Sequence, residues 1–239
     1  MKILAIDTSS RNCSVAIVEA SKDSFSTISL KNSNDERTHS VKLMPMVDEM
    51  FKKSNLCLND IDLLACCLGP GSFTGIRIGV ASCKAFADAK SIPVVGVTSL
   101  ESLAYNVENN GYIVSMIDAK NNNVYATLAI NNDSKYELKK EFSADSIENI
   151  LNDYLAFFND NNITHVCFVG NGSEIYKDLI SEKFANFNVT FSDNNTQSGI
   201  TLSKCAYKKY LEGAYGDANS ISPIYLRKSQ AERAANGEK

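Results

Sequence analysis

The order of the secondary-structure patterns is the strongest constraint on the fold, because the same order occurs twice along the chain. In residues 1–108, three short β-type runs come first, and helix-type and strand-type segments then alternate. The predicted elements are strands at Lys2–Asp7, Ser14–Glu19 and Ser24–Leu30, a helix near Ser40–Lys53, a strand at Asp62–Leu68, a helix near Ile76–Lys90, a strand at Val94–Val97 and a helix from Ser99.

Residues 109–228 repeat this order with different side chains. The predicted elements are strands at Tyr112–Asp118, Val124–Ile130 and Tyr136–Phe142, a helix near Asp145–Phe158, a strand at His165–Gly170, a helix from Ser173, a strand at Val189–Ser192 and a helix near Ile200–Leu211. This pattern predicts two related α/β lobes, each built as three antiparallel strands followed by alternating helices and strands. The polar residues 229–239 are expected to form a flexible tail.

The overall composition limits the class of protein. With 239 residues, 44% of them hydrophobic, the chain is long enough for a substantial core. No apolar run approaches the roughly 20 residues of a membrane helix, and Asp7 interrupts the first apolar run, so we expect a cytoplasmic protein without a signal peptide. A net charge of −4 disfavours direct binding of nucleic acid by this chain alone. The seven cysteines form no Cys-x-x-Cys pair, which favours buried hydrophobes over a zinc site or a redox pair.

The first predicted turn joins an acid to two hydroxyl side chains. Asp7, Thr8 and Ser9 close the first strand, and the hydroxyls and backbone N–H groups of such a turn can donate to a phosphate. A duplicated three-stranded sheet with an acidic first strand is also typical of the actin, hexokinase and sugar-kinase class of ATPases. The structural alternative is that Asp7 caps a tight turn, and the residues alone favour it.

The segment Gly69–Gly79, with the sequence GPGSFTGIRIG, lies between a buried strand and a helix. Glycines let the backbone approach a ligand closely, and hydroxyls near a helix N-terminus attract anions. The segment lacks the Gly-Lys-Ser/Thr of a Walker A loop, so phosphate binding and a structural turn are equally good predictions. The candidate nucleotide- or phosphate-binding residues are Asp7, Thr8, Ser9, Gly69, Gly71, Ser72, Thr74 and Gly75.

Four segments together resemble one protein family: Ile3–Ser9, Gly69–Gly79, Pro93–Leu100 and Pro223–Arg227. They are similar to the TsaB (YeaZ) family of tRNA threonylcarbamoyladenosine biosynthesis subunits. The resemblance implies a duplicated actin-like (ASKHA, ribonuclease H-like) ATPase fold. Where the family has an Asp-Ala-Arg segment, this sequence has Asp-Ala-Lys, ending at Lys120.

The resemblance also implies a partnership. Members of the family pair as a heterodimer with the catalytic paralogue TsaD, joined by the small ATPase TsaE. TsaD transfers a threonylcarbamoyl group to N6 of an adenosine in tRNA. By this resemblance the chain is a non-catalytic subunit that binds and organises TsaD and meets tRNA only through the complex. No cofactor is expected in this chain, and ATP or ADP is expected, if anywhere, at the interface of the complex.

The histidines favour a role without catalysis. The resemblance implies that the catalytic paralogue holds a metal with two histidines one helical turn apart, on the helix after the third strand. Here the residue four places after His39 is Leu43, and the other histidine, His165, begins a strand. No metal site and no catalytic residue are therefore predicted. The alternatives are an independent ATP-binding kinase or ATPase-like enzyme, and a glycoprotease-like peptidase, which the missing histidine pair and the missing Gly-x-Ser-x-Gly motif disfavour.

Two predicted helices are more apolar than a single sheet requires. The apolar residues of the first helix cover about 160° of its circumference, whereas a helix packed on one sheet needs about 100°. We predict that the edge with Leu43, Met46 and Met50 faces outwards and docks on the paralogue. Met44, Val47 and Phe51 lie toward the other edge. The alternatives are that the helices cover one another within the monomer or pair in a homodimer. The predicted interface residues are His39, Leu43, Met46, Met50, Arg77, Val80 and Lys84.

Overall fold

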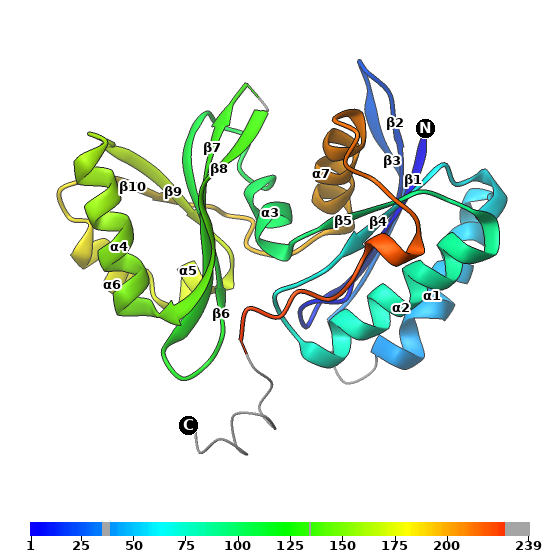
Figure 1. Cartoon of the computed structure of the whole chain (residues 1–239), viewed down its shortest axis with the longest axis horizontal. Coiled ribbons are helices and arrows are strands. Elements are labelled where there is room, and N and C mark those ends of the chain that lie inside the picture. Colours follow the sequence, from blue (N-terminus) through cyan, green and yellow to red (C-terminus); the bar gives the residue numbers. More distant parts are fainter. Residues whose placement is uncertain (35–38, 134, 228–239) are drawn as a thin grey trace.

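The computed structural model describes residues 1–34, 39–133 and 135–227. It contains two five-stranded sheets that share one strand order (Figure 1). The first sheet has the order β3-β2-β1-β4-β5, and the second has the equivalent order β8-β7-β6-β9-β10. In each sheet the first three strands are antiparallel and the last two add in parallel. This repeated topology confirms the duplicated actin-like α/β fold.

The helices and strands occur in the predicted order. The first-half elements are β1 (Lys2–Asp7), β2 (Cys13–Ala20), β3 (Phe25–Ser33), α1 (His39–Ser54), the 3-10 helix η2 (Leu58–Asp60), β4 (Leu63–Cys67), α2 (Phe73–Lys90), β5 (Val94–Val97) and α3 (Ser99–Ala104). The second-half elements are β6 (Gly111–Asp118), β7 (Asn123–Asn132), β8 (Lys135–Ser146), α4 (Ile147–Asp160), β9 (His165–Val169), α5 (Asn171–Ile175), α6 (Lys177–Lys183), β10 (Asn188–Phe191), α7 (Gly199–Leu211) and the 3-10 helix η3 (Ala218–Ser220).

Two helices differ from the prediction for local reasons. Helix α2 begins at Phe73, earlier than expected, because the Ser72 hydroxyl caps it by accepting a hydrogen bond from the Gly75 N–H. The single helix predicted from Ser173 is two short helices, α5 and α6, which meet at Tyr176. Strand positions are more reliable than helix ends, because a continuous run of buried apolar residues marks a strand, whereas a capping residue can shift the end of a helix.

The last helix of each half packs on the sheet of the other half. Figure 1 shows α1 and α2 on the outer face of the first sheet, α4 and α6 on the outer face of the second, and α3 and α7 between the two sheets. Leu202 of α7 is buried with Ile3 and Ala5 of β1. Leu103 of α3 is buried with Ile113 of β6. Each lobe therefore needs a helix from the other half to cover its inner face.

This exchange crosses the boundary that was predicted between the two lobes. Residues 1–108 and 109–228 were expected to form separate lobes, but α7 lies on the first sheet and α3 lies against the second. The chain after α7 also returns to the first lobe, where Ile221 is buried in its core. The spacing of apolar residues shows that a helix is amphipathic, but it does not show which sheet the apolar face covers. The predicted tail, residues 229–239, lies outside the described residues.

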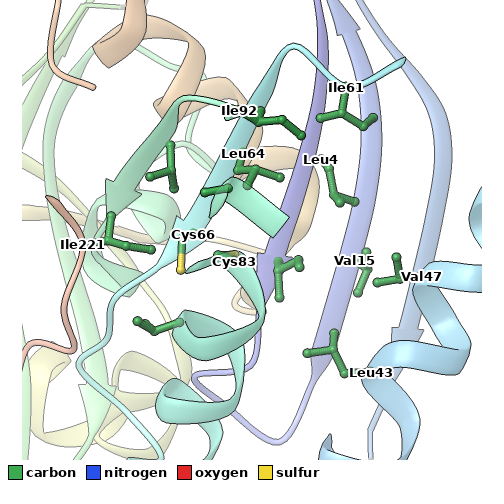
Figure 2. Packing of buried hydrophobic residues seen from close by; sticks show 14 of the residues in the cluster. Leu4, Val15, Leu43, Val47, Ile61, Leu64, Cys66, Cys83, Ile92 and Ile221 are labelled. Atoms are coloured by element: carbon green, nitrogen blue, oxygen red, sulfur yellow. The ribbon is translucent and has the colours of Figure 1, made fainter. Parts of the chain in front are cut away.

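The core of the first lobe forms between its sheet and the helices α1 and α2. Figure 2 shows Leu43 and Val47 of α1 reaching toward Val15 of β2, and Cys66 of β4 beside Cys83 of α2. All five side chains are at most 5% exposed. Complete burial of an aliphatic side chain of this size stabilises a fold by about 1.5–3 kcal/mol.

Most of the cysteines are buried. All seven cysteines are free. A hydrogen bond with Cys83, together with burial, raises the pKa of the Cys66 thiol well above its usual value, and burial does the same for the pKa of Cys67, so both behave as small apolar side chains. Cys57 is exposed, in contrast to the expectation of burial. In the part of the chain that the structure describes, no helix is long and apolar enough to span a bilayer.

Candidate functional site

The glycine loop packs directly on the turn between β1 and β2. A side chain at Gly71 would collide with the Ser9 carbonyl oxygen, and one at Gly75 would collide with the Thr8 carbonyl oxygen. Gly79, one turn further along α2, leaves room for the Thr8 hydroxyl in the same way. Glycine is required at Gly71 and Gly75 because two backbones touch there, and at Gly79 because α2 meets the Thr8 side chain.

Hydrogen bonds between the two turns occupy the polar groups of the loop. The Ser72 N–H donates to the Ser9 carbonyl (2.7 Å), and the Thr8 hydroxyl donates to the Gly75 carbonyl (2.7 Å). The Gly75 N–H donates to the Ser72 hydroxyl (3.3 Å). The Ser72 and Gly75 N–H groups are thus bonded within the protein, as in a strand-to-helix turn, and this geometry favours the structural alternative.

Asp7 lies beneath this contact rather than facing solvent. Its side chain is fully buried, and Oδ1 accepts hydrogen bonds from the N–H (2.9 Å) and the hydroxyl (2.7 Å) of Ser9. Oδ2 has no hydrogen-bond partner within the described parts of the chain. Burial raises the pKa of the Asp7 carboxyl, although the hydrogen bonds from Ser9 act in the opposite direction. In this position Asp7 orders the first turn.

A polar cleft of about 730 Å³ lies between the lobes. Of the predicted phosphate-binding residues, only Ser9, Gly71 and Ser72 line it. The other five, Asp7, Thr8, Gly69, Thr74 and Gly75, do not. The sequence did not predict further lining residues, which lie in turns, at the start of α5 and near the C-terminus, where no periodic pattern singles them out: Arg11, Asn12, Asn171, Asn195, Gln197 and Arg227.

The turn between β6 and β7 forms the opposite wall of the cleft. It occupies the same place in the second lobe as the β1–β2 turn does in the first. Lys120, which stands where the family has arginine, pairs with Asp118 (Nζ to Oδ2, 2.6 Å) and its side chain is 80% exposed. Arg227 donates to the Ala119 carbonyl (3.0 Å). The cleft thus carries cationic side chains from the turn and from the end of the described chain.

The predicted docking edge of α1 is wrong, because its side chains belong to the core of the monomer. Leu43, Met46 and Met50 are 1%, 4% and 1% exposed. His39 is buried as well, and its Nε2 donates to the Arg11 carbonyl (3.2 Å). A wide apolar stripe indicates that a helix contacts a second apolar surface besides its own sheet. The helical period alone does not show which edge of the stripe faces the sheet.

The exposed edge of α1 is the other one. Val41 is 72% exposed and Met44 is 42% exposed, and both face away from the sheet. On α2, Val80 is buried in the core, whereas Arg77 is exposed and Lys84 is half-buried. The predicted interface residues are therefore divided between the core and the surface.

Comparisons with known proteins cover almost the whole chain. Residues 32–235 match the family model of TsaD, tRNA N6-adenosine threonylcarbamoyltransferase. The tRNA threonylcarbamoyladenosine biosynthesis protein TsaB of Haemophilus influenzae is 32% identical over 235 residues, which cover 95% of this chain and 94% of that protein. The protein of the same name from Bacillus subtilis is 30% identical over 237 residues, which cover 97% of this chain and 96% of that protein.

A solved structure agrees with these relatives in fold. YeaZ from Pseudomonas aeruginosa matches with a TM-score of 0.77 and 24% identity, over 94% of this chain and 99% of that chain. The sequence matches extend through both lobes, and the glycine loop, the first turn and the repeated sheets are all present. The chain belongs to the TsaB family of tRNA threonylcarbamoyladenosine biosynthesis proteins, within the wider group that the TsaD model describes.

Proposed function

We propose that this chain is a non-catalytic subunit of the complex that places threonylcarbamoyl on N6 of adenosine in tRNA. In that complex it binds and organises the catalytic paralogue TsaD, and the ATPase TsaE is a further partner. The observation that carries this proposal is the exposed apolar edge of α1, which lies beside α2 on the outer face of the first sheet. Family membership supplies the reaction to which this surface is assigned.

The docking face is the outward surface of α1 and α2. Val41 and Met44 supply its apolar part, and the small exposed residues Ala81 and Ala85 on α2 leave room for a helix of a partner to approach. Arg77 adds a charged group on the same helix. An apolar centre with a polar rim is the usual build of a protein interface. A second copy of this chain is the alternative occupant of the same face.

The state of His39 supports a role without metal chemistry. Its imidazole is buried and bonded to the Arg11 carbonyl, and the residue one turn later, Leu43, is in the core. A metal held by this helix would need a second ligand at that place. The catalytic group is accordingly assigned to the paralogue.

The glycine loop supports the proposal that this chain holds no nucleotide of its own. Its glycines at positions 71 and 75 make room for the carbonyls of Ser9 and Thr8, so close packing within the chain accounts for them. ATP or ADP is assigned to the interface of the complex, and tRNA to a surface that includes the paralogue, because this chain has a net charge of −4.

The substitution Val41→Glu tests the docking face. The carboxylate is harmless in water but would be buried unpaired at the interface, so binding of purified TsaD should weaken by about a hundredfold or more, with loss of tRNA modification in a reconstituted system. The melting temperature should stay unchanged. Ile175→Glu, at an exposed apolar residue of the second lobe, is the matched control and should bind normally.

Three measurements separate the alternatives. Unchanged binding of TsaD by Val41→Glu would place the docking face elsewhere. Sedimentation of the isolated chain shows whether it forms a homodimer and whether the same substitution dissociates that homodimer into monomers. Turnover of ATP by the isolated chain would favour the ATPase-like alternative over the subunit role.

A further inference from the structure

The residues 221–227, which we call the strap, connect the cores of the two lobes. Ile221 is 2% exposed in the core of the first lobe, and Leu226 packs on the core cluster of the second lobe that contains α3. Between them, the Ile224 N–H donates to the Leu68 carbonyl (2.8 Å). Figure 1 shows this orange-red segment crossing from α2 toward β6. The strap therefore contacts both lobes.

The strap is fastened to the first turns of α2 by an aromatic pair. The Tyr225 ring stacks on the Phe73 ring, with centroids 4.7 Å apart and planes 4° from parallel. Arg77 Nε donates to the Tyr225 hydroxyl (2.7 Å), and its guanidinium carbon lies 5.5 Å from the ring centroid. Arg77 is exposed on α2, so this fastening reaches the surface that the proposed function assigns to the partner.

Two residues later, the strap holds the second lobe. Arg227 Nη1 donates to the Ala119 carbonyl (3.0 Å) in the turn between β6 and β7. Phe73 and Arg227 also both line the cleft between the lobes. A short chain of contacts thus runs from Arg77 on the first lobe to Ala119 on the second.

We propose that the strap is a clasp between the lobes, and that the bond from Arg77 sets how tightly it closes. Arg77 Nε holds the Tyr225 hydroxyl, so the ring stays stacked on Phe73 at the start of α2. The position of Tyr225 in turn places Arg227, two residues later, on the Ala119 carbonyl. Loss of the bond from Arg77 should therefore loosen the hold of the strap on the second lobe.

The clasp can be tested on the isolated full-length chain by hydrogen exchange. The Ala119 N–H donates to the Asn123 carbonyl (2.9 Å) and the Asn123 N–H donates to the Lys120 carbonyl (3.1 Å), so this turn has amides whose protection can be followed. Arg77→Ala should speed their exchange about five- to tenfold, as expected when one hydrogen bond is lost from a local opening. The control is Lys84→Ala, which removes a cation two turns further along α2 and should leave the turn unchanged.

Tyr225→Phe keeps the stacked ring and removes only the hydroxyl. It should speed exchange of the same turn as much as Arg77→Ala does, and the double variant should add nothing further. This variant also keeps the test valid if Arg77→Ala lowers the stability of α2. The clasp is overturned if either variant changes exchange only within α2 and the strap, with no effect in the β6–β7 turn.

Discussion

Gly75 lies where the first turn and the glycine loop, two of the segments that resemble the family, touch each other. Its Cα faces the Thr8 carbonyl so closely that no side chain fits, and its own carbonyl accepts from the Thr8 hydroxyl. Sequence alone left phosphate binding and tight packing equally open, because both need glycine. Only the position of the Thr8 backbone distinguishes them.

Gly75→Val should lower the free energy of unfolding by about 3 kcal/mol or more, because the new side chain has to push the first turn away from α2. Urea denaturation gives the value directly. The control is Thr74→Val, an exposed substitution of the same shape one residue earlier, which should change stability by less than about 0.5 kcal/mol. Equal stability of Gly75→Val and wild type would show that the loop and the turn are not in contact.

At the scale of elements, helix α1 shows what amphipathic patterns determine. The stripe of buried side chains consists of His39, Leu43, Met46, Val47 and Met50. The apolar positions predicted the helix correctly, and the choice of edge went wrong because apolar residues continue past both sides of the stripe. Exposed Val41 was missed since it stands apart from that stripe.

Met46→Glu provides the test of this orientation. A carboxylate placed in the core would be unpaired, at a cost of several kcal/mol, so the variant should unfold or lose most of its stability. Met44→Glu, two residues away on the exposed edge, should melt within a few degrees of wild type. Thermal melting followed by circular dichroism compares them. A folded Met46→Glu protein with a normal melting temperature would restore the original assignment of the faces.

The strands were the most predictable elements. The starts of helices and the breaks between them were the least predictable. The runs at Lys2–Asp7 and Val94–Val97 have the predicted bounds, because continuous β-branched and aliphatic residues mark buried strands clearly. The start of α2 was displaced by the Ser72 cap, and the region after β9 divides into two short helices. The cleft residues Arg11 and Arg227 gave no pattern to follow, because they come together only through the fold.

At the scale of the whole molecule, the exchange of α3 and α7 makes the two lobes depend on each other. The inner face of the first sheet, which includes Ile3, Ala65 and Val97, is covered by α7 from the end of the chain. The inner face of the second sheet is covered by α3, which comes before it in sequence. Neither half of the sequence contains all the apolar surface that its own sheet requires.

A fragment of residues 1–108 should therefore fail to unfold cooperatively, because one face of its sheet would stay in water. Residues 109–227 should behave in the same way. When the two fragments are expressed together they should form a one-to-one complex with a sharp thermal transition. Circular dichroism melts and size-exclusion chromatography of each fragment and of the pair check this. A sharp transition for residues 1–108 alone would contradict the mutual dependence of the lobes.

The exchanged helices also bear on the history of a duplicated chain. A single-lobe ancestor with the present arrangement would have had an uncovered inner sheet face and a last helix with no place on its own sheet. Two copies that traded their last helices would have satisfied both needs at once, as domain-swapped dimers do. Gene fusion would then have joined a pair that already existed. On this view the present monomer is an ancient symmetric dimer made covalent, and its two halves were free to diverge in side chains while the swapped helices kept them together.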